Sequence, residues 1–250
     1  MNSQTNPNNP TSQSNLTNPD HHPSPRTKTA KGTDATPITT VLFDLDGTII
    51  DTNELIIQSF LYALKGIVPP TFSREKIIPL MGQTLLAQMK QFSGREEVDE
   101  LLVAYRDYSL RHHDDMVSLF PGVGEVIPLL KRHGMQLGVV TTKMRETTDR
   151  ALKLLGLYET MDVIVTLDDV KHPKPHAEPV ETALRALGAD PAGALMVGDS
   201  GVDILSALAA GAVPVGVAWS LKGDAVLRDA GASHIIHDMR ELISLCGIEG

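Results

Sequence analysis

Two aspartates separated by one residue, Asp44 and Asp46, are the first candidates for chemistry in this sequence. They follow residues 38–43, ITTVLF, which predict a buried strand. Because alternate residues of a strand point to the same face, the two carboxylates can start out in the same direction. One could attack a phosphorus atom while the other gives a proton to the leaving group and later takes one from water. Gly47 would allow a tight turn and a close approach of the backbone to a phosphate, although D-x-D-G also occurs in ordinary solvated turns.

Two further groups of polar residues follow later apolar runs. Thr141, Thr142 and Lys143 come after LGVV at 137–140, where a hydroxyl and backbone N–H groups could hold a phosphate oxygen. Lys174 lies between two prolines that restrict its backbone, so it could neutralise both an aspartate nucleophile and an incoming phosphoryl group. Taken singly, the threonines are also typical turn residues and the lysine is typical of an exposed loop.

A fourth polar group, GDSGVD at 198–203, follows the apolar run ALMV at 194–197. Asp199 could complete a magnesium site with Asp44, because Mg²⁺ prefers hard oxygen ligands. Asp203 could orient a metal-bound water or lie behind the ligands. Asp199 or Ser200 could instead cap a helix that begins near residue 202.

The elements that must position these residues alternate between strand and helix. Such alternation predicts an α/β fold with a doubly wound parallel sheet, in which ligands bind beyond the carboxyl ends of the strands. Gly156, Gly188 and Gly211 stand where helices should end. The predicted strands are 38–43, 137–140, 163–165, 194–197, 213–217 and 234–236, and the predicted helices are 146–155, 177–187, 202–210, 224–230 and 239–246.

Residues 54–120 interrupt this alternation, since they contain no convincing strand and four helical patterns. We predict a helical domain there, inserted between the first two strands of a core formed by 38–53 and 121–250. Ser93 and Glu96 resemble a capping box. The four helical patterns cover about 55–64, 74–81, 84–92 and 96–113.

Composition narrows the classes of partner. Residues 1–37 are rich in Asn, Thr, Ser and Pro and have almost nothing to bury, so they predict a disordered tail. The chain is acidic, with a net charge of −9 and no basic stripe, which argues against nucleic acid as a partner. It has no apolar run of membrane-spanning length, so we expect no membrane partner. Its single cysteine, Cys246, excludes an internal disulfide and fits a cytoplasmic protein.

The four motifs together resemble those of the haloacid dehalogenase superfamily. DLDGT is similar to its first motif, which implies Asp44 as the nucleophile and Asp46 as the general acid/base. VVTTK is similar to the second, which implies Thr141 as the phosphate-binding hydroxyl, and Lys174 matches the third. The insertion at 54–120 resembles that family's small helical cap.

GDSGVD is similar to the fourth motif, which implies Asp199 on Mg²⁺ and Asp203 beside it. The resemblance further implies that Asp44 and the backbone carbonyl of Asp46 complete the magnesium ligands. The substrate-binding residues that it implies lie within the first two motifs: Gly47, Thr48, Thr142 and Lys143.

Within the superfamily, TNELIIQSF, LGVVTTKMRETT, VTLDDVKHPKP and GVAWSLKG resemble a bacterial pyrophosphatase branch. This implies hydrolysis of pyrophosphate to two phosphates, and a pathway link to HPr kinase/phosphorylase without a stable complex. One departure is that many relatives read Pro-Asp-Pro after the lysine of the third motif, while here Pro175 is followed by His176 and Ala177.

Substrate choice should depend on the cap and on loops near it. Candidates to hold the second phosphoryl group are Lys143, Arg145, His172, Lys222, His112 and His113, although each could also be an ordinary surface residue. Glu54 could line the entrance or simply face solvent. The same core would also suit a phosphomonoesterase acting on a small organic phosphate such as phosphoglycolate, or a phosphoglucomutase-like transferase. A dehalogenase is disfavoured, because carbon–halogen displacement requires neither magnesium nor the proton transfer that Asp46 suits. A non-catalytic module that only holds a cation is a further alternative.

Overall fold

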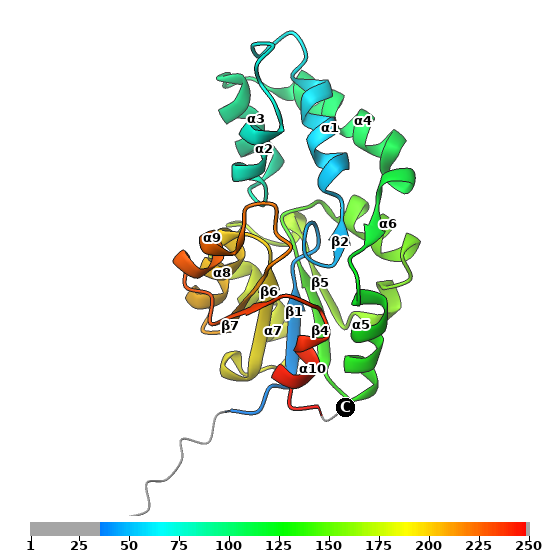
Figure 1. The fold of residues 1–250 in the computed structure, drawn as a ribbon, viewed down its shortest axis with the longest axis vertical. Helices are drawn as coiled ribbons and strands as arrows, with labels where there is room; N and C mark the ends of the chain where they lie inside the picture. The colour runs from blue at the N-terminus through cyan, green and yellow to red at the C-terminus, as the bar shows by residue number, and fades with distance from the viewer. Residues whose placement is uncertain (1–35, 249–250) are drawn as a thin grey trace, which may run out of the picture. The chain divides into compact units, whose positions relative to one another are not determined.

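The computed structural model describes residues 36–248, and a six-stranded parallel sheet with the order β5-β4-β1-β6-β7-β8 forms its centre (Figure 1). Most of the predicted tail, residues 1–35, lies outside the described residues. All six predicted strands are present. They are β1 (Thr40–Phe43), β4 (Gln136–Val140), β5 (Val163–Val165), β6 (Ala194–Gly198), β7 (Val213–Val217) and β8 (His234–Ile236).

The central strand β1 is fully buried and divides the core into two layers. Val41 and Phe43 belong to one apolar cluster and Leu42 to the other, as the two-residue period of a strand requires. The first cluster includes residues of α5 (Val123–Arg132), α6 (Arg145–Leu154) and α10 (Glu241–Leu245). The second includes residues of α7 (Glu178–Leu187) and α8 (Gly201–Ala209). Helices therefore cover both faces, and the predicted doubly wound α/β fold is confirmed.

A short antiparallel ribbon carries the chain out of the core and back. It pairs β2 (Ile50–Asp51) with β3 (Ser118–Leu119), so that Ile50 lies opposite Leu119. The prediction that 54–120 contains no strand was wrong at β3, because a two-residue strand is too short to leave a pattern in the sequence. Between the two strands lie α1 (Asn53–Ala63), α2 (Arg74–Ile77), a 3-10 helix (Ile78–Leu80), α3 (Leu85–Ser93) and α4 (Asp99–Met116), here called the helical insertion.

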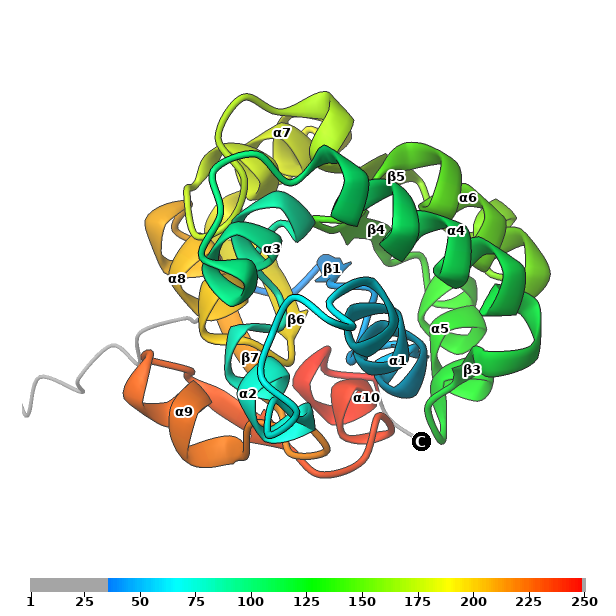
Figure 2. The same ribbon diagram turned by 90° about the horizontal axis from the view of Figure 1, so that it is seen from above.

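The helical insertion has an apolar core of its own, in which the ring of Phe60 packs 5.1 Å from that of Phe92 and 4.7 Å from that of Tyr105. Its helices lie beyond the sheet end where β1 and β6 finish (Figures 1 and 2). None of the helices among residues 36–248 is long and apolar enough to cross a membrane.

The capping box predicted from Ser93 and Glu96 was wrong. Ser93 is the last residue of α3, where its hydroxyl donates to the carbonyl of Met89. Glu96 accepts from Lys90 at 2.8 Å instead, and α4 begins three residues later than Glu96. The serine closes the preceding helix because Gly94 follows it in the left-handed conformation that ends helices.

Candidate active site

The ends of the three central strands bring the predicted motifs together. Asp44 follows β1, Thr141 follows β4 and Asp199 follows β6, and both β4 and β6 pair with β1. The N–H of Asp44 donates to the carbonyl of Val197 at 2.8 Å, which ties the first motif to the fourth. Residues more than 90 positions apart thus meet because parallel strands end at the same edge of the sheet.

Three buried carboxylates, those of Asp44, Asp199 and Asp203, have oxygen atoms within 4.8 Å of one another. The ammonium of Lys174 lies between two of them, 2.6 Å from Asp44 Oδ1 and 2.6 Å from Asp203 Oδ1. It also donates to the carbonyl of Val140 at 2.8 Å, so its three N–H bonds all have acceptors. Lys174 is therefore not an exposed loop lysine: only 4% of its surface is accessible.

Two further lysines pair with the remaining carboxylates. Lys222 Nζ lies 2.9 Å from Asp199 Oδ2, with both side chains buried. Lys143 Nζ lies 2.8 Å from Asp46 Oδ1, and Thr52 donates to the same oxygen at 2.8 Å. Lys143 comes from the loop after β4 and Lys222 from the loop after β7. At the sheet end, each of these carboxylates therefore has a lysine beside it.

This charge distribution favours a bound cation. Burial and the neighbouring carboxylates, opposed by Lys174, raise the pKa of Asp44 to about 8, and burial also raises the pKa of Asp199. Burial lowers the pKa of Lys174, but the charges of Asp203 and Asp44 outweigh it and raise that pKa above its usual value. Three buried carboxylates are thus opposed by only two ammonium groups, those of Lys174 and Lys222. A hard divalent cation would relieve this excess, and a donor set made of oxygen atoms suits Mg²⁺.

Two glycines permit the close approach of the motifs. Gly47 has a φ of +84°, and a Cβ there would lie 2.8 Å from Asp199 Oδ2. A Cβ on Gly198 would lie 2.3 Å from Cβ of Asp203. Glycine is therefore required at position 47 for two reasons: the backbone is in the left-handed region, and a side chain would collide with Asp199 of the fourth motif.

Asp203 serves the helix and the site at once. Its Oδ2 accepts from the N–H of Ser200 at 3.0 Å, and the Ser200 side chain accepts in return from the N–H of Asp203. This is the helix cap that the sequence left open as an alternative. Because its Oδ1 holds Lys174, the structural and the functional interpretation both apply to the same side chain.

A cavity of about 340 Å³ lies between the sheet end and the helical insertion. Six of the predicted site residues line it: Asp44, Asp46, Asp199, Thr141, Thr142 and Lys143. The other predicted residues lie behind this surface. Thr48 is fully buried and its hydroxyl has no hydrogen-bond partner among the described residues. Gly47 packs against Asp199, Lys174 binds Asp44, and Asp203 binds Lys174.

Most of the predicted specificity residues are engaged elsewhere, and Lys143 is the one that lines the cavity. Arg145 binds Asp169 and the carbonyl of Ile164. Lys222 binds Asp199, which is itself in the lining. The remaining four have partners outside the lining: His172 binds Glu178, Glu54 binds Arg74, His113 binds Asp114, and the ring of His112 packs 4.3 Å from that of Tyr108.

The helical insertion contributes lining residues that the sequence analysis missed, of which Arg106 on α4 carries the positive charge. Among the described residues of the insertion, it is the one lysine or arginine in the lining. The other missed residues of this wall include Gln88, Tyr105 and Ser109. Helical periodicity places Tyr105, Arg106 and Ser109 on a common face of α4, but nothing in the sequence shows which face of a helix meets another domain.

Comparisons with known proteins identify the family. Residues 41–217 match the haloacid dehalogenase-like hydrolase family. The chain is 44% identical over 214 residues to "Pyrophosphatase PpaX" of Bacillus velezensis, which covers 85% of this chain and 98% of the relative. It is 44% identical over 208 residues to the protein of the same name in Bacillus cereus, which covers 83% of this chain and 96% of that relative.

Solved structures show the same architecture. A putative haloacid dehalogenase-like hydrolase from Bacteroides fragilis superposes with a TM-score of 0.75 at 28% identity, over 82% of this chain and all of that one. A putative phosphoglycolate phosphatase from Lactobacillus plantarum superposes with a TM-score of 0.76 over 84% of this chain and all of that one, and at 23% identity it shows the fold alone. By sequence and by fold, the chain is an enzyme that belongs to the haloacid dehalogenase-like hydrolase family.

Proposed function

We propose that this protein is a magnesium-dependent pyrophosphatase that forms a phosphoryl-aspartate on Asp44. The observation that carries the proposal is the position of Asp44, which lines the cavity at the end of the central strand with the Lys174 ammonium 2.6 Å away. The near full-length likeness to proteins named Pyrophosphatase PpaX supports pyrophosphate as the substrate.

In this mechanism, a carboxylate oxygen of Asp44 forms a bond to phosphorus while the bond to the departing phosphate breaks. Asp46, which also lines the cavity, gives the departing phosphate a proton. Asp46 then takes a proton from water, which attacks the phosphorus of the aspartyl-phosphate and restores Asp44. Splitting one displacement into two allows a positioned carboxylate to replace bulk water as the first nucleophile.

The remaining site residues hold charge in place. Lys174 compensates Asp44 and, through Asp203, stays fixed to the helix that follows β6. Thr141, Thr142, Lys143 and N–H groups of the first-motif loop, at Gly47 and Thr48, are suited to the transferring oxygens. Asp44, Asp199 and the backbone carbonyl of Asp46 would hold Mg²⁺, with Asp203 behind them. The metal would cancel charge on a phosphoryl oxygen that otherwise repels the nucleophile.

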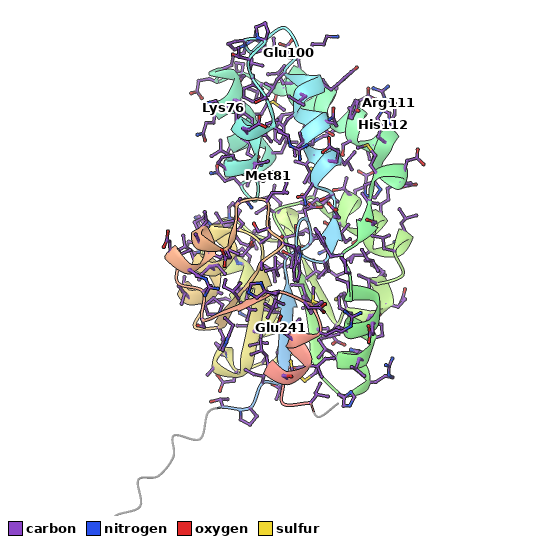
Figure 3. All side chains as sticks on the ribbon, viewed as in Figure 1. Lys76, Met81, Glu100, Arg111, His112 and Glu241 are labelled. Carbon is purple, nitrogen blue, oxygen red and sulfur yellow. The ribbon has the colours of Figure 1, made fainter. Side chains whose placement is uncertain are left out.

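We further propose that residues 54–120 act as a cap over this site. Thr142 donates to the carbonyl of Gly82 at 3.1 Å and Ser200 to that of Met81 at 3.4 Å, so the loop before α3 already contacts the core. Met81 lies at the end of the helical insertion that meets the core (Figure 3). If the cap closes on substrate, a phosphate analogue should protect the cavity from solvent, as hydrogen exchange would measure. Equal exchange with and without the analogue would contradict closure.

A second candidate function is hydrolysis of a small organic phosphate. The cavity wall formed by the helical insertion is largely apolar, with Leu55, Ile56, Leu85, Leu86 and Leu110 in the lining. Pyrophosphate offers no apolar group to such a wall, whereas the organic part of a phosphomonoester does. The same core residues would serve both reactions.

Phosphate release with Mg²⁺ separates the two candidates when pyrophosphate is compared with phosphoglycolate and a panel of sugar phosphates. A kcat/KM for pyrophosphate at least tenfold above the others would support the pyrophosphatase. A preference for an organic phosphate would keep the Asp44 mechanism and overturn the substrate. No release from any substrate, with Mg²⁺ bound, would favour a non-catalytic cation-binding module.

The pathway link to HPr kinase/phosphorylase stays a prediction. If it holds, loss of this protein should raise cellular pyrophosphate in a host that has the kinase/phosphorylase. The rise should disappear when the kinase/phosphorylase is also removed. A rise that is the same in both backgrounds would contradict the link.

A further inference from the structure

A second group of metal-ligating side chains lies in the loop that carries Lys174, outside the cavity. His172, His176 and Glu178 each offer one ligand atom, and these atoms lie within 4.8 Å of one another. None of the three lines the cavity or contacts the carboxylates of the sheet end. The proposed mechanism gives none of the three a role.

The carboxylate of this group is already fixed in position. Glu178 accepts hydrogen bonds from the backbone N–H groups of Lys171 at 2.9 Å and His172 at 3.0 Å. The ring of His172 adds a third contact to the same carboxylate. An ionised, immobilised carboxylate is the part of a metal site that costs least to organise on binding.

The two imidazoles stand beside it. His172 Nδ1 lies 2.8 Å from Glu178 Oε2, and a bound ion could take the place of the hydrogen atom between them. The rings of His172 and His176 are 4.8 Å apart at 33°, and His176 Nδ1 accepts from the N–H of Glu178, which leaves Nε2 as its metal ligand. Both histidines are exposed, so their rings can rotate to bring the nitrogens to the 2.0–2.1 Å that Zn²⁺ requires.

The ligand types decide which cation fits. Two imidazoles and one carboxylate favour Zn²⁺ and its neighbours Co²⁺ and Ni²⁺, whereas Mg²⁺ prefers a set made of oxygen atoms such as Asp44 and Asp199. Three protein ligands on an exposed loop leave a coordination position for water. The protein would thus hold two chemically distinct cation sites.

We propose that His172, His176 and Glu178 form a second metal site, which binds a transition-metal dication of the Zn²⁺ class. His172 lies two residues before Lys174 and His176 two residues after it. A bound ion therefore cross-links the loop whose lysine is held by Asp44 and Asp203.

Zinc binding by the full chain tests this proposal. The protein should lack a histidine tag and carry His21→Ala and His22→Ala, since these two histidines lie outside the described residues and could bind zinc themselves. Equilibrium dialysis in excess Mg²⁺, which occupies the carboxylate site, should give one zinc per chain. The double variant His172→Ala/His176→Ala should lose that zinc, and His176→Ala alone should raise its Kd at least tenfold. The exposed His237→Ala is the matched control and should leave the Kd unchanged.

Imidazole NMR signals provide a second readout that does not depend on activity. Zinc should shift the ring signals of His172 and His176 and leave those of His237 in place. An equal zinc stoichiometry in the wild type and the double variant, or unshifted His172 and His176 signals, would overturn the site. Because no catalytic measurement enters, failure of the pyrophosphatase proposal would leave this result interpretable.

Discussion

The two walls of the cavity differ in how they are made. The wall at the sheet end contains the carboxylates of Asp44, Asp46 and Asp199, and each of them is paired with a lysine at 2.6–2.9 Å. The wall from the helical insertion consists mainly of apolar side chains, with Arg106 as its one positive charge among the described residues. From this contrast we propose that the chemistry resides in the core, and that the insertion selects what the core acts on.

Substitutions in the two walls should also differ in their effect on the stability of the fold. A buried charge that loses its partner is costly, so substitutions at the sheet end should affect both folding and turnover. Ile56, Met81 and Tyr105 both line the cavity and pack in the insertion's own apolar core, whereas Arg106 and Ser109 line the cavity outside that core. Substitutions there should alter substrate preference with little effect on stability.

The largest effect is expected from Asp44→Asn. Removal of the nucleophile should lower kcat at least a thousandfold, while the amide keeps the size of the side chain and the fold. Stopped assays for phosphate release measure this, with Asp229→Asn on the exposed end of α9 (Asp224–Asp229) as a control that should retain full activity. Near-normal turnover in an Asp44→Asn preparation free of wild-type protein would exclude the covalent mechanism.

Lys174→Met should be the next most damaging change. It leaves Asp44 and Asp203 buried without their shared ammonium, so the free energy of unfolding should fall by about 3–5 kcal/mol. Activity should fall by about a hundredfold or more, because the transferring charge loses its counterion. Denaturant unfolding and phosphate release measure the two effects, and the exposed Lys171→Met should show neither. A loss of activity with unchanged stability would show that the buried ion pair contributes nothing to folding.

Arg106→Ala tests the wall of the insertion. If Arg106 holds the second phosphoryl group, kcat/KM for pyrophosphate should fall about 10- to 100-fold, as loss of a charged hydrogen bond predicts. Stability should change little, and a phosphomonoester with an apolar group should lose less activity than pyrophosphate. Arg111→Ala, on the outer face of the same helix (Figure 3), is the matched control. Equal losses in the two variants would remove Arg106 from the specificity determinants.

The pH dependence of magnesium binding should be the mildest effect. With the pKa of Asp44 raised to about 8, the metal-free site carries a proton below that pH and Mg²⁺ must displace it. The Kd for Mg²⁺ should therefore fall about tenfold per pH unit from 6 to 8 and level off above 8. Trp219, the single tryptophan, donates to the carbonyl of Thr48 at 3.3 Å and offers a fluorescence signal. In Asp44→Asn the slope should vanish, and a wild-type Kd that is flat across this range would contradict the raised pKa.

Much of the fold could be predicted because its signals are local. Six apolar runs became the six strands, and Gly188 ends α7 in the left-handed conformation, as its type predicted. The errors have physical reasons. The ribbon of β2 and β3 pairs only two residues in each strand, and the capping box at Ser93 fits the letters of a motif while the serine ends one helix instead of starting the next.

The sequence by itself singled out the candidate residues of the reaction, since Asp44, Thr141 and Asp199 directly follow predicted strands and Lys174 lies in the loop after another. The tertiary structure alone decided how they are paired: that Lys174 is shared by Asp44 and Asp203, that Lys222 binds Asp199, and that Arg106 faces the cavity. Local patterns fix which face of a strand or helix is apolar, because that depends on neighbours a few residues away. Which charges meet depends on strand order and on the packing of the insertion, and these depend on contacts between residues that are distant in the sequence.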